Sequence, residues 1–351
     1  MVLIGEILFI NLTCLTLAET KLKLNMKLKH LAIASMFAFA IISCKQSEGS
    51  VKSYTEEDMK ENPLVQQSSL PYFAPEFDKI KIEHFKPALE YGLQLQSEAI
   101  EQIANNPEEP TFENTLVALE KSGEVLSRAS RVFYALSSAD TNDELNAIKE
   151  EMTPKFSEHS DNIVLNEKLF ARIKTLHDQI DDLDLDQEDR KLLEITYQNF
   201  EKEGANLNPE DKEKLKEINS KLATLTNRFG QTLLDATNAA SVVVTDVEKL
   251  SGLTEGEINS LKVDGKDEWL IPIHNTTQQP LTQALDDREL REELFKASWS
   301  RTEKGEYSTL DMIKEIVQLR NDKAKLLGYD NYAAWNLQDT MVKNTETVFE
   351  F

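Results

Sequence analysis

Apolar residues recur at spacings of three and four positions through most of the chain from residue 71 onward. The most regular stripe lies within residues 209–238, and its members are Leu215, Ile218, Leu222, Leu225, Phe229, Leu233 and Ala236. This spacing places the side chains on one face of an α-helix. Asn208 suits the N-cap position, and Pro209 suits the first helical position. The pattern therefore predicts a long helix that packs against a neighbouring helix.

A second periodic stretch lies within residues 307–343. Its apolar residues are Leu310, Ile313, Ile316, Val317, Leu319, Ala324 and Leu327. Ser308 and Asp311 have the spacing of a capping box, and Gly328 can end the helix in the left-handed conformation. We therefore predict a helix that starts near Ser308, a tight turn, and a second helix capped by Asp330.

Weaker periodicity predicts several shorter helices upstream. Their ranges are 85–103, 111–126, 143–155, 166–176, 186–203 and 288–298, the last opened by Asp286. The pattern changes near residues 241–285, where Val242-Val243-Val244 and Trp269-Leu270-Ile271 are short runs typical of strands. We expect a small strand-containing insertion there, with residues 253–261 as a short helix. The predicted fold class is mainly α, a helical bundle.

Four segments carry a specific resemblance to known proteins. They read FDKIKIEHFKPALEYGL (77–93), TFENTLVALEKSG (111–123), LNPEDKEKLKEINSKLATLTNRFGQTLLDATNA (207–239) and LRNDKAKLLGYDNYAAWNLQDTMVK (319–343). In this order they resemble the zinc peptidase family that contains thimet oligopeptidase, oligopeptidase A and dipeptidyl carboxypeptidase. The dipeptidyl carboxypeptidase branch is the most similar, and the resemblance covers residues 62–351.

The resemblance implies that the chain is the N-terminal helical half of a zinc metallopeptidase with a neurolysin-like fold. The implied activity is the hydrolysis of oligopeptides with release of C-terminal dipeptides, the implied cofactor is zinc, and the implied partners are short peptides. A zinc site of this class needs H-E-x-x-H, because two histidines four residues apart share one helix face. The histidines after residue 44 are His84, His159, His177 and His274, and no two are four apart. We therefore predict no catalytic and no metal-binding residue in these 351 residues, and an inactive chain.

The acidic run HDQIDDLDLDQED (177–189) is the other candidate metal site. Asp182, Asp184 and Asp186 match the first three ligands of a calcium loop. Gln187 stands where that loop needs glycine, and Leu193 stands where it needs glutamate. A solvated acidic turn that caps the next helix is the favoured interpretation.

Composition and charge exclude some partners. The net charge is −23, with 62 acidic and 39 basic residues, which disfavours nucleic acid because phosphate backbones need clustered Lys and Arg. The hydrophobic content of 40% is enough for a sizeable folded core. Only Cys14 and Cys44 are present, so no disulfide framework is expected in the body.

The N-terminal residues predict export. Residues 26–43 combine a basic start with an apolar run of signal-peptide length, and Ile-Ile-Ser-Cys at 41–44 resembles the lipobox of bacterial lipoproteins. We expect lipid on Cys44, with residues 1–25 a spurious leader and 44–70 a polar tether. An ordinary signal peptide or an uncleaved anchor is the alternative. The predicted location is a membrane-anchored lipoprotein facing the periplasm or the cell surface, in contact with the membrane through its lipid alone.

Residues 344–351 begin a new apolar stripe that stops after about two turns, which is short for a stable helix. We therefore expect the folded region, 71–351, to be truncated at its C-terminus. Two functions remain open. In the first, the chain is a fragment of a lipid-anchored zinc peptidase, and in the second it is a non-catalytic helical binding or scaffold lipoprotein.

Overall fold

The computed structural model describes residues 53–351. Contacts divide the chain into two units, Met1–Ser53 and Tyr54–Phe351. The predicted leader (1–25), the signal peptide (26–43) and Cys44 therefore lie outside the described residues. Of the helices in residues 53–351, none is long and apolar enough to cross a lipid bilayer.

The second unit is mainly helical, as predicted. Its helices are α2 (Glu56–Met59), α3 (Phe85–Ala104), α4 (Ala118–Ser122), α5 (Glu124–Ala139), α6 (Asp143–Val164), α7 (Glu167–Asp178), α8 (Gln187–Lys202), α9 (Pro209–Ala239), α10 (Glu255–Leu261), α11 (Asn275–Ala284), α12 (Arg288–Ser300), α13 (Leu310–Leu326), α14 (Tyr332–Asn336) and α15 (Thr345–Glu350). The two strands are β1 (Val242–Val244) and β2 (Trp269–Ile271).

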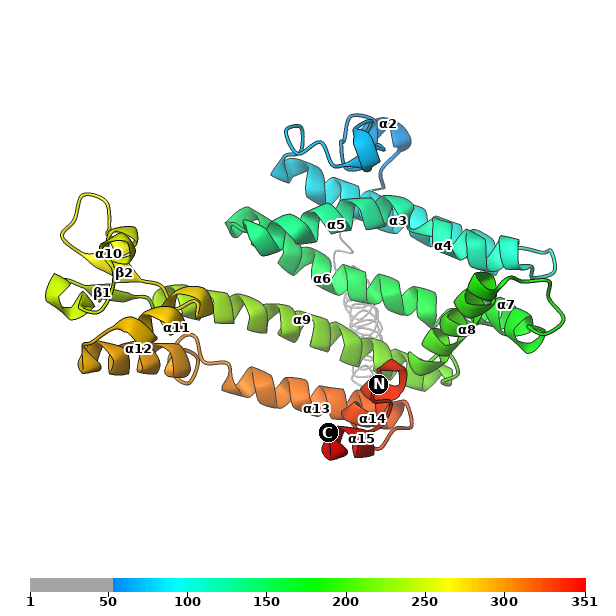
Figure 1. The fold of residues 1–351 in the computed structure, drawn as a ribbon. Coiled ribbons are helices and arrows are strands. Elements are labelled where there is room, and N and C mark those ends of the chain that lie inside the picture. Colours follow the sequence, from blue (N-terminus) through cyan, green and yellow to red (C-terminus); the bar gives the residue numbers. More distant parts are fainter. Residues whose placement is uncertain (1–52) are drawn as a thin grey trace, which may run out of the picture. The chain divides into compact units, whose positions relative to one another are not determined.

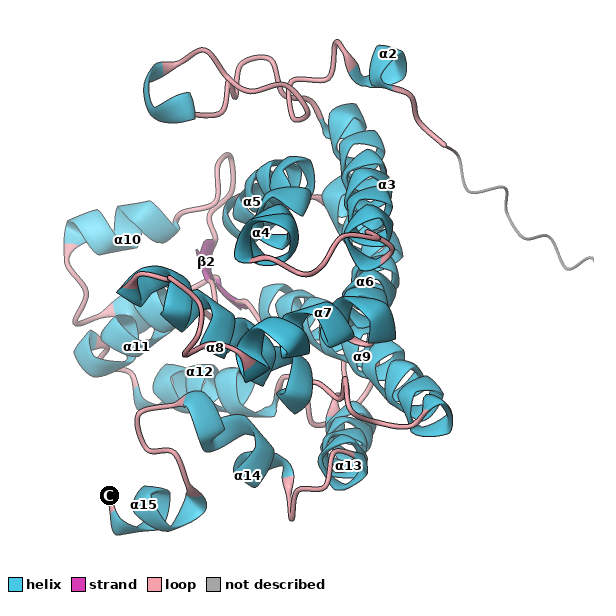
Figure 2. Cartoon of the chain, turned by 90° about the vertical axis from the view of Figure 1, so that its right-hand side faces the viewer, coloured by secondary structure: helices cyan, strands magenta, loops and turns pink. Residues whose placement is uncertain are grey.

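The long helices succeed one another in layers. Helix α3 packs against α5 and α6, α6 packs against α9, and α9 packs against α13. Figure 1 shows this succession from top to bottom, and Figure 2 shows it from the side. Helix α9 thus has the helical neighbour that its stripe predicted, and a second one on another side. Asn208 Oδ1 accepts a hydrogen bond from the backbone N–H of Asp211 at 3.0 Å, which confirms the predicted N-cap.

Two apolar clusters stabilise the region that precedes α9. The cluster between α3, α5 and α6 is centred on Phe85 and Phe133, whose ring centroids lie 5.4 Å apart. The second cluster joins the end of α3 to α7 and α8, and it includes Phe170 and Phe200, stacked at 6.1 Å. Burial of aromatic side chains on this scale fixes the relative positions of these helices.

The predicted insertion contains the two strands. β1 and β2 pair antiparallel with Val242 opposite Ile271 and Val244 opposite Trp269, and these four side chains are buried. Val243 and Leu270 point to the other face and are exposed, as the alternation of side chains along a strand requires. The predicted short helix corresponds to α10.

Three expectations for residues 111–300 need correction. Thr111 does cap its helix, but the predicted range 111–126 is a π-helical segment (Phe112–Val117) followed by α4, and it breaks at Gly123 before α5. Helix α11 was not predicted, because its polar sequence NTTQQPLTQA has little apolar periodicity. Asp287 caps α12 in place of Asp286, whose carboxylate accepts a hydrogen bond from Ser251 Oγ at 2.8 Å.

The predicted capping box at the start of α13 does not form. Thr309 occupies the N-cap position without a side-chain hydrogen bond. The Asp311 carboxylate pairs with Lys314 at 3.1 Å, so it does not reach back to Ser308. Gly328 does adopt the left-handed conformation after the helix, with φ of 86°. Asn331, one residue after the predicted Asp330, caps α14 through a bond from the N–H of Ala334.

The structure describes the last part of the predicted tether (44–70) as folded. Thr55 forms a capping box that starts α2, and Tyr54, Met59 and Leu64 are buried. The Tyr54 hydroxyl donates a hydrogen bond to Glu90 on α3 at 3.0 Å. A few apolar residues can hold an otherwise polar segment in place, because they pack against the surface of the folded helices.

Candidate functional site

The described residues do not form a metal centre. In residues 53–351, no three His, Cys, Asp or Glu side chains lie close enough together to hold a metal ion. Zinc sites in proteins need three or four such ligands around one point. The residues described here therefore do not fit the zinc ion that the resemblance implies, and no catalytic step can be derived through it.

His84 and His159 have structural partners. His84 Nδ1 accepts a hydrogen bond from the backbone N–H of Lys81 at 3.1 Å. His159 Nε2 lies 2.8 Å from Gln96 Oε1, and its Nδ1 lies 3.3 Å from Ser97 Oγ. Burial lowers the pKa of the His159 imidazole. The His84 ring therefore supports its own turn, and the His159 ring contacts α3 from α6.

The acidic run at 177–189 behaves as a capping turn. His177 stacks on the Tyr197 ring at a centroid distance of 3.8 Å and is not directed toward its neighbouring acids. The Asp181 carboxylate pairs with Arg190 at 2.9 Å. Asp186 caps α8 by accepting a hydrogen bond from the N–H of Asp189. In residues 53–351, Asp182, Asp184 and Asp186 do not form a group of ligands that could hold a metal ion, and the contacts of Asp186 fit the favoured interpretation of a capping turn.

A buried carboxyl group lies where α6 meets α9 and α13. Asp161 on α6 is 9% exposed, and its Oδ1 accepts a hydrogen bond from Asn219 Nδ2 on α9 at 2.7 Å. Its Oδ2 is buried with no partner among the described atoms. Burial raises the Asp161 pKa to about 6, Lys323 and Lys216 oppose the shift, and Glu203 adds to it.

Lys323 and Trp335 form further polar contacts near Asp161. Lys323 on α13 is also 9% exposed, and its Nζ pairs with Glu203 at 3.0 Å. The same ammonium lies 4.6 Å from the centroid of the Trp335 ring. Trp335 Nε1 donates a hydrogen bond to the carbonyl of Lys202 at 3.0 Å, and Lys202 Nζ pairs with Asp339. These contacts fasten α14 to the end of α8.

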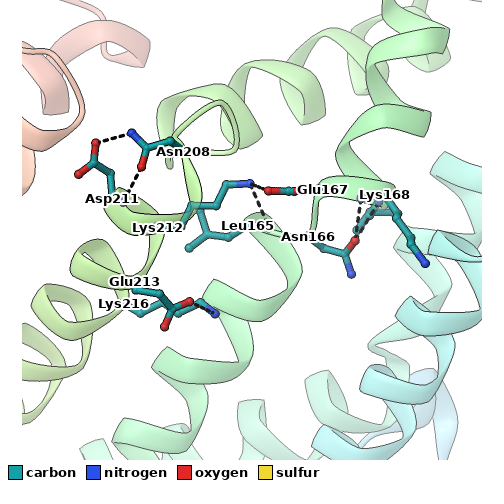
Figure 3. A network of polar contacts seen from close by, with 10 residues as sticks. Leu165, Asn166, Glu167, Lys168, Asn208, Asp211, Lys212, Glu213 and Lys216 are labelled. Atoms are coloured by element: carbon teal, nitrogen blue, oxygen red, sulfur yellow. Dashed lines mark hydrogen bonds and ion pairs between the residues drawn. The ribbon is translucent and has the colours of Figure 1, made fainter.

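A third buried charge ties the start of α9 to the turn between α6 and α7. Figure 3 shows Lys212 reaching from α9 toward Leu165 and Glu167. Its Nζ donates to the Leu165 carbonyl at 3.3 Å and to Glu167 Oε1 at 3.1 Å. Sequence reasoning missed these buried charges. Their partners are 45 and 47 positions away for Lys212, and 58 for Asp161, so no local pattern marks them.

Comparison with known sequences identifies relatives for most of the chain. Residues 281–351 match the model of peptidase family M3. Dipeptidyl carboxypeptidase from Salmonella typhimurium is 43% identical over 299 residues, which cover 84% of this chain and 44% of that protein. Dipeptidyl carboxypeptidase from Escherichia coli is also 43% identical, over 83% of this chain and 44% of its own length.

A more distant relative is oligopeptidase A from Escherichia coli, which is 28% identical over 83% of this chain and 43% of that protein. The chain thus spans less than half the length of these curated relatives. The family model, the dipeptidyl carboxypeptidases and oligopeptidase A all agree with the resemblance of the four segments. Residues 281–351 thus match peptidase family M3, and the chain is similar to the dipeptidyl carboxypeptidases over more than four fifths of its length.

Proposed function

We propose that this chain is the helical part of a zinc metallopeptidase that hydrolyses oligopeptides and releases C-terminal dipeptides. The observation that carries the proposal is the 43% identity to dipeptidyl carboxypeptidase over 84% of the chain. In this proposal the 351 residues contribute the helical framework and contacts to the peptide. Polypeptide beyond them contributes the zinc ligands and the general base, and the chain is inactive alone.

The test uses the native gene product. Antibodies against α9 would isolate the product from its source cells, and mass spectrometry would give its intact mass. The release of dipeptides from an N-blocked oligopeptide would then be measured with and without a zinc chelator. We expect activity that chelation abolishes, in a product with a mass greater than that of the 351 residues.

A product with the mass of the 351 residues, or a processed form of them, that binds peptides without cleaving them would overturn the proposal. The chain would then be a helical binding or scaffold protein. Recombinant chain of 351 residues is the matched control, and we expect it to release no dipeptide.

We also propose that the chain is exported and carries lipid on Cys44. The support is the basic start and apolar run of residues 26–43, followed by Ile-Ile-Ser-Cys. Metabolic labelling with an alkyne fatty acid in a bacterial host tests this. We expect Cys44→Ser to lose the label and Cys14→Ser, the control, to keep it. Label that survives in Cys44→Ser would contradict lipid attachment at Cys44.

A further inference from the structure

A groove of about 460 Å³ lies between α6, α9, α13 and α14. Its lining residues are Lys149 and Thr153 from α6, Leu222, Ala223, Thr226, Asn227 and Gly230 from α9, Arg320 from α13, and Tyr332 from α14. It has two cations, three neutral polar side chains, one aromatic ring and no carboxylate. All four helices belong to the same folded unit.

The two cations of the groove have no acidic partner within the described chain. Neither Lys149 nor Arg320 forms an ion pair there, and both are half-buried. The sequence explains why. The positions three and four residues from Lys149 hold Leu145, Asn146, Met152 and Thr153, and those around Arg320 hold Ile316, Val317, Lys323 and Ala324. No carboxylate can therefore reach either cation along its own helix face.

Some other cations on these helices, and on others, form ion pairs, whereas Lys221 and Arg228 on α9 and Lys325 on α13 form none within the described residues. Ion pairs at a spacing of four residues join Lys155 to Glu151, Lys174 to Asp178, Lys214 to Glu210, and Lys296 to Glu292. The chain as a whole carries a net charge of −23. Lys149 and Arg320 are half-buried and line one groove that has no carboxylate in its lining, so the groove is complementary to an anion.

Side chains around the cations are positioned to support a ligand. The Arg320 guanidinium lies 5.1 Å from the centroid of the Tyr332 ring, which restricts its orientation. Tyr332 in turn contacts Trp335 at a centroid distance of 5.1 Å. The side chains of Thr226 and Asn227 have no hydrogen-bond partner in the described residues, so their polar groups can serve a ligand.

Gly230 lines the groove without a side chain. It lies inside α9, where glycine destabilises a helix relative to alanine. A Cβ added at this position would meet no atom within 4 Å, so packing within the described chain does not require a glycine. The missing side chain leaves the surface of α9 accessible to a ligand at this point of the groove.

We propose that this groove binds a carboxylate of a peptide, with Arg320 and Lys149 as its charge partners. The Arg320 guanidinium can donate two parallel hydrogen bonds to the two carboxylate oxygens, and Lys149 adds a second positive charge from α6. Thr226 and Asn227 bind the adjoining peptide groups, while Leu222 and Tyr332 contact a small apolar side chain. That the anion belongs to a peptide rests on the proposed function.

The test measures the binding of acetyl-Ala-Ala-Ala to the 351-residue chain by calorimetry, as the free acid and as the C-terminal amide. We expect the amide to bind about tenfold or more weakly, the range of a lost charge-assisted hydrogen bond. Equal binding of acid and amide would overturn the proposal. Long-range attraction cannot explain a preference for the acid, because the protein and the acid are both negative.

Variants locate the site. We expect Arg320→Gln and Lys149→Gln each to weaken binding of the free acid about tenfold, and to leave binding of the amide unchanged. Lys325→Gln is the matched control, since Lys325 is an exposed cation on α13 outside the groove. An effect of Lys325→Gln equal to that of Arg320→Gln would show a general effect of charge and would overturn the site.

Gly230→Met tests the groove without removing a charge. Because nothing opposes a Cβ there, we expect the variant to fold with an unchanged or higher melting temperature and to lose binding. Gly256→Met on α10, also in open space, is its control and should bind normally. Wild-type affinity in a folded Gly230→Met variant would place the ligand elsewhere.

The peptidase proposal and the groove can fail separately. Acid-selective binding lost in Arg320→Gln, in a native product without hydrolytic activity, would retain the groove and reject the peptidase. A hydrolytic native product whose KM for free-acid peptides is unchanged by Arg320→Gln would retain the peptidase and reject the groove.

Discussion

Two regions of this protein differ in how far their large apolar side chains are buried. In the first, residues 85–205, the large apolar side chains are buried or half-buried except for Tyr134 and Ile195, and Phe133, at 0% exposed, lies in one cluster. In the second, residues 288–351, many are exposed, and Phe349 is 90% exposed. The other large apolar side chains exposed in the second region are Phe295, Trp299, Leu310, Ile313, Val317, Met341, Val348 and Phe351.

The comparison shows what hydrophobic periodicity can and cannot establish. The apolar stripe of α13 predicts the helix correctly, yet Leu310, Ile313 and Val317 are exposed, and only one side of the helix packs against α9. Periodicity identifies a face suited to burial but does not name the partner that covers it. Exposed apolar surface of this extent is characteristic of interaction surfaces.

The largest expected contrast comes from truncating one phenylalanine in each region. Phe133→Ala removes a fully buried ring from the cluster with Phe85, and we expect a loss of about 3–5 kcal/mol of unfolding free energy. Phe349→Ala removes an exposed ring, and we expect a change within about 0.5 kcal/mol. Urea denaturation of the purified chain measures both. Similar losses from the two variants would mean that the second region has a core of its own.

Asp161 lies at the boundary between these regions and should show a distinctive pH dependence. Its folded pKa is raised to about 6 from 3.8 because burial disfavours the charged carboxylate. Between these values the folded state holds a proton that the unfolded state has lost. Stability attributable to Asp161 therefore falls as pH rises through this window, and the ionised group destabilises the fold at neutral pH.

We accordingly expect Asp161→Asn to stabilise the protein by about 1–2 kcal/mol at pH 7.5, with the gain disappearing below about pH 4. Asparagine keeps the oxygen that accepts from Asn219 and removes the buried charge. Asp339→Asn is the control of opposite sign, because the hydrogen bond and charge of Lys202 lower the Asp339 pKa. Thermal melts across pH measure both, and a gain from Asp161→Asn that persists at pH 3.5 would refute the linkage.

The predictability of the structure follows the range of the interactions involved. Helices such as α9 were predictable because Asn208 and the apolar stripe are signals within one segment. Helix α11 was not, because its polar sequence gives no periodic signal, and only Leu281 of this helix joins the buried apolar cluster that includes Val242 and Trp269. The groove lined by Lys149 and Arg320 could not be predicted from the sequence either, since its residues come from four helices and come together only in the folded chain.

The smallest expected effects on stability come from alanine substitutions at the N-terminal ends of α9 and α13. Asn208 accepts the Asp211 N–H at the start of α9, so Asn208→Ala should cost about 1 kcal/mol. Ser308 makes no cap at α13, where Thr309 occupies the N-cap position without a side-chain bond, so Ser308→Ala should change stability by less than about 0.5 kcal/mol. Urea midpoints of the two alanine variants decide the point. An equal loss in Ser308→Ala would mean that the capping box predicted from Ser308 and Asp311 forms in solution, and that the start of α13 is as firmly fixed as that of α9.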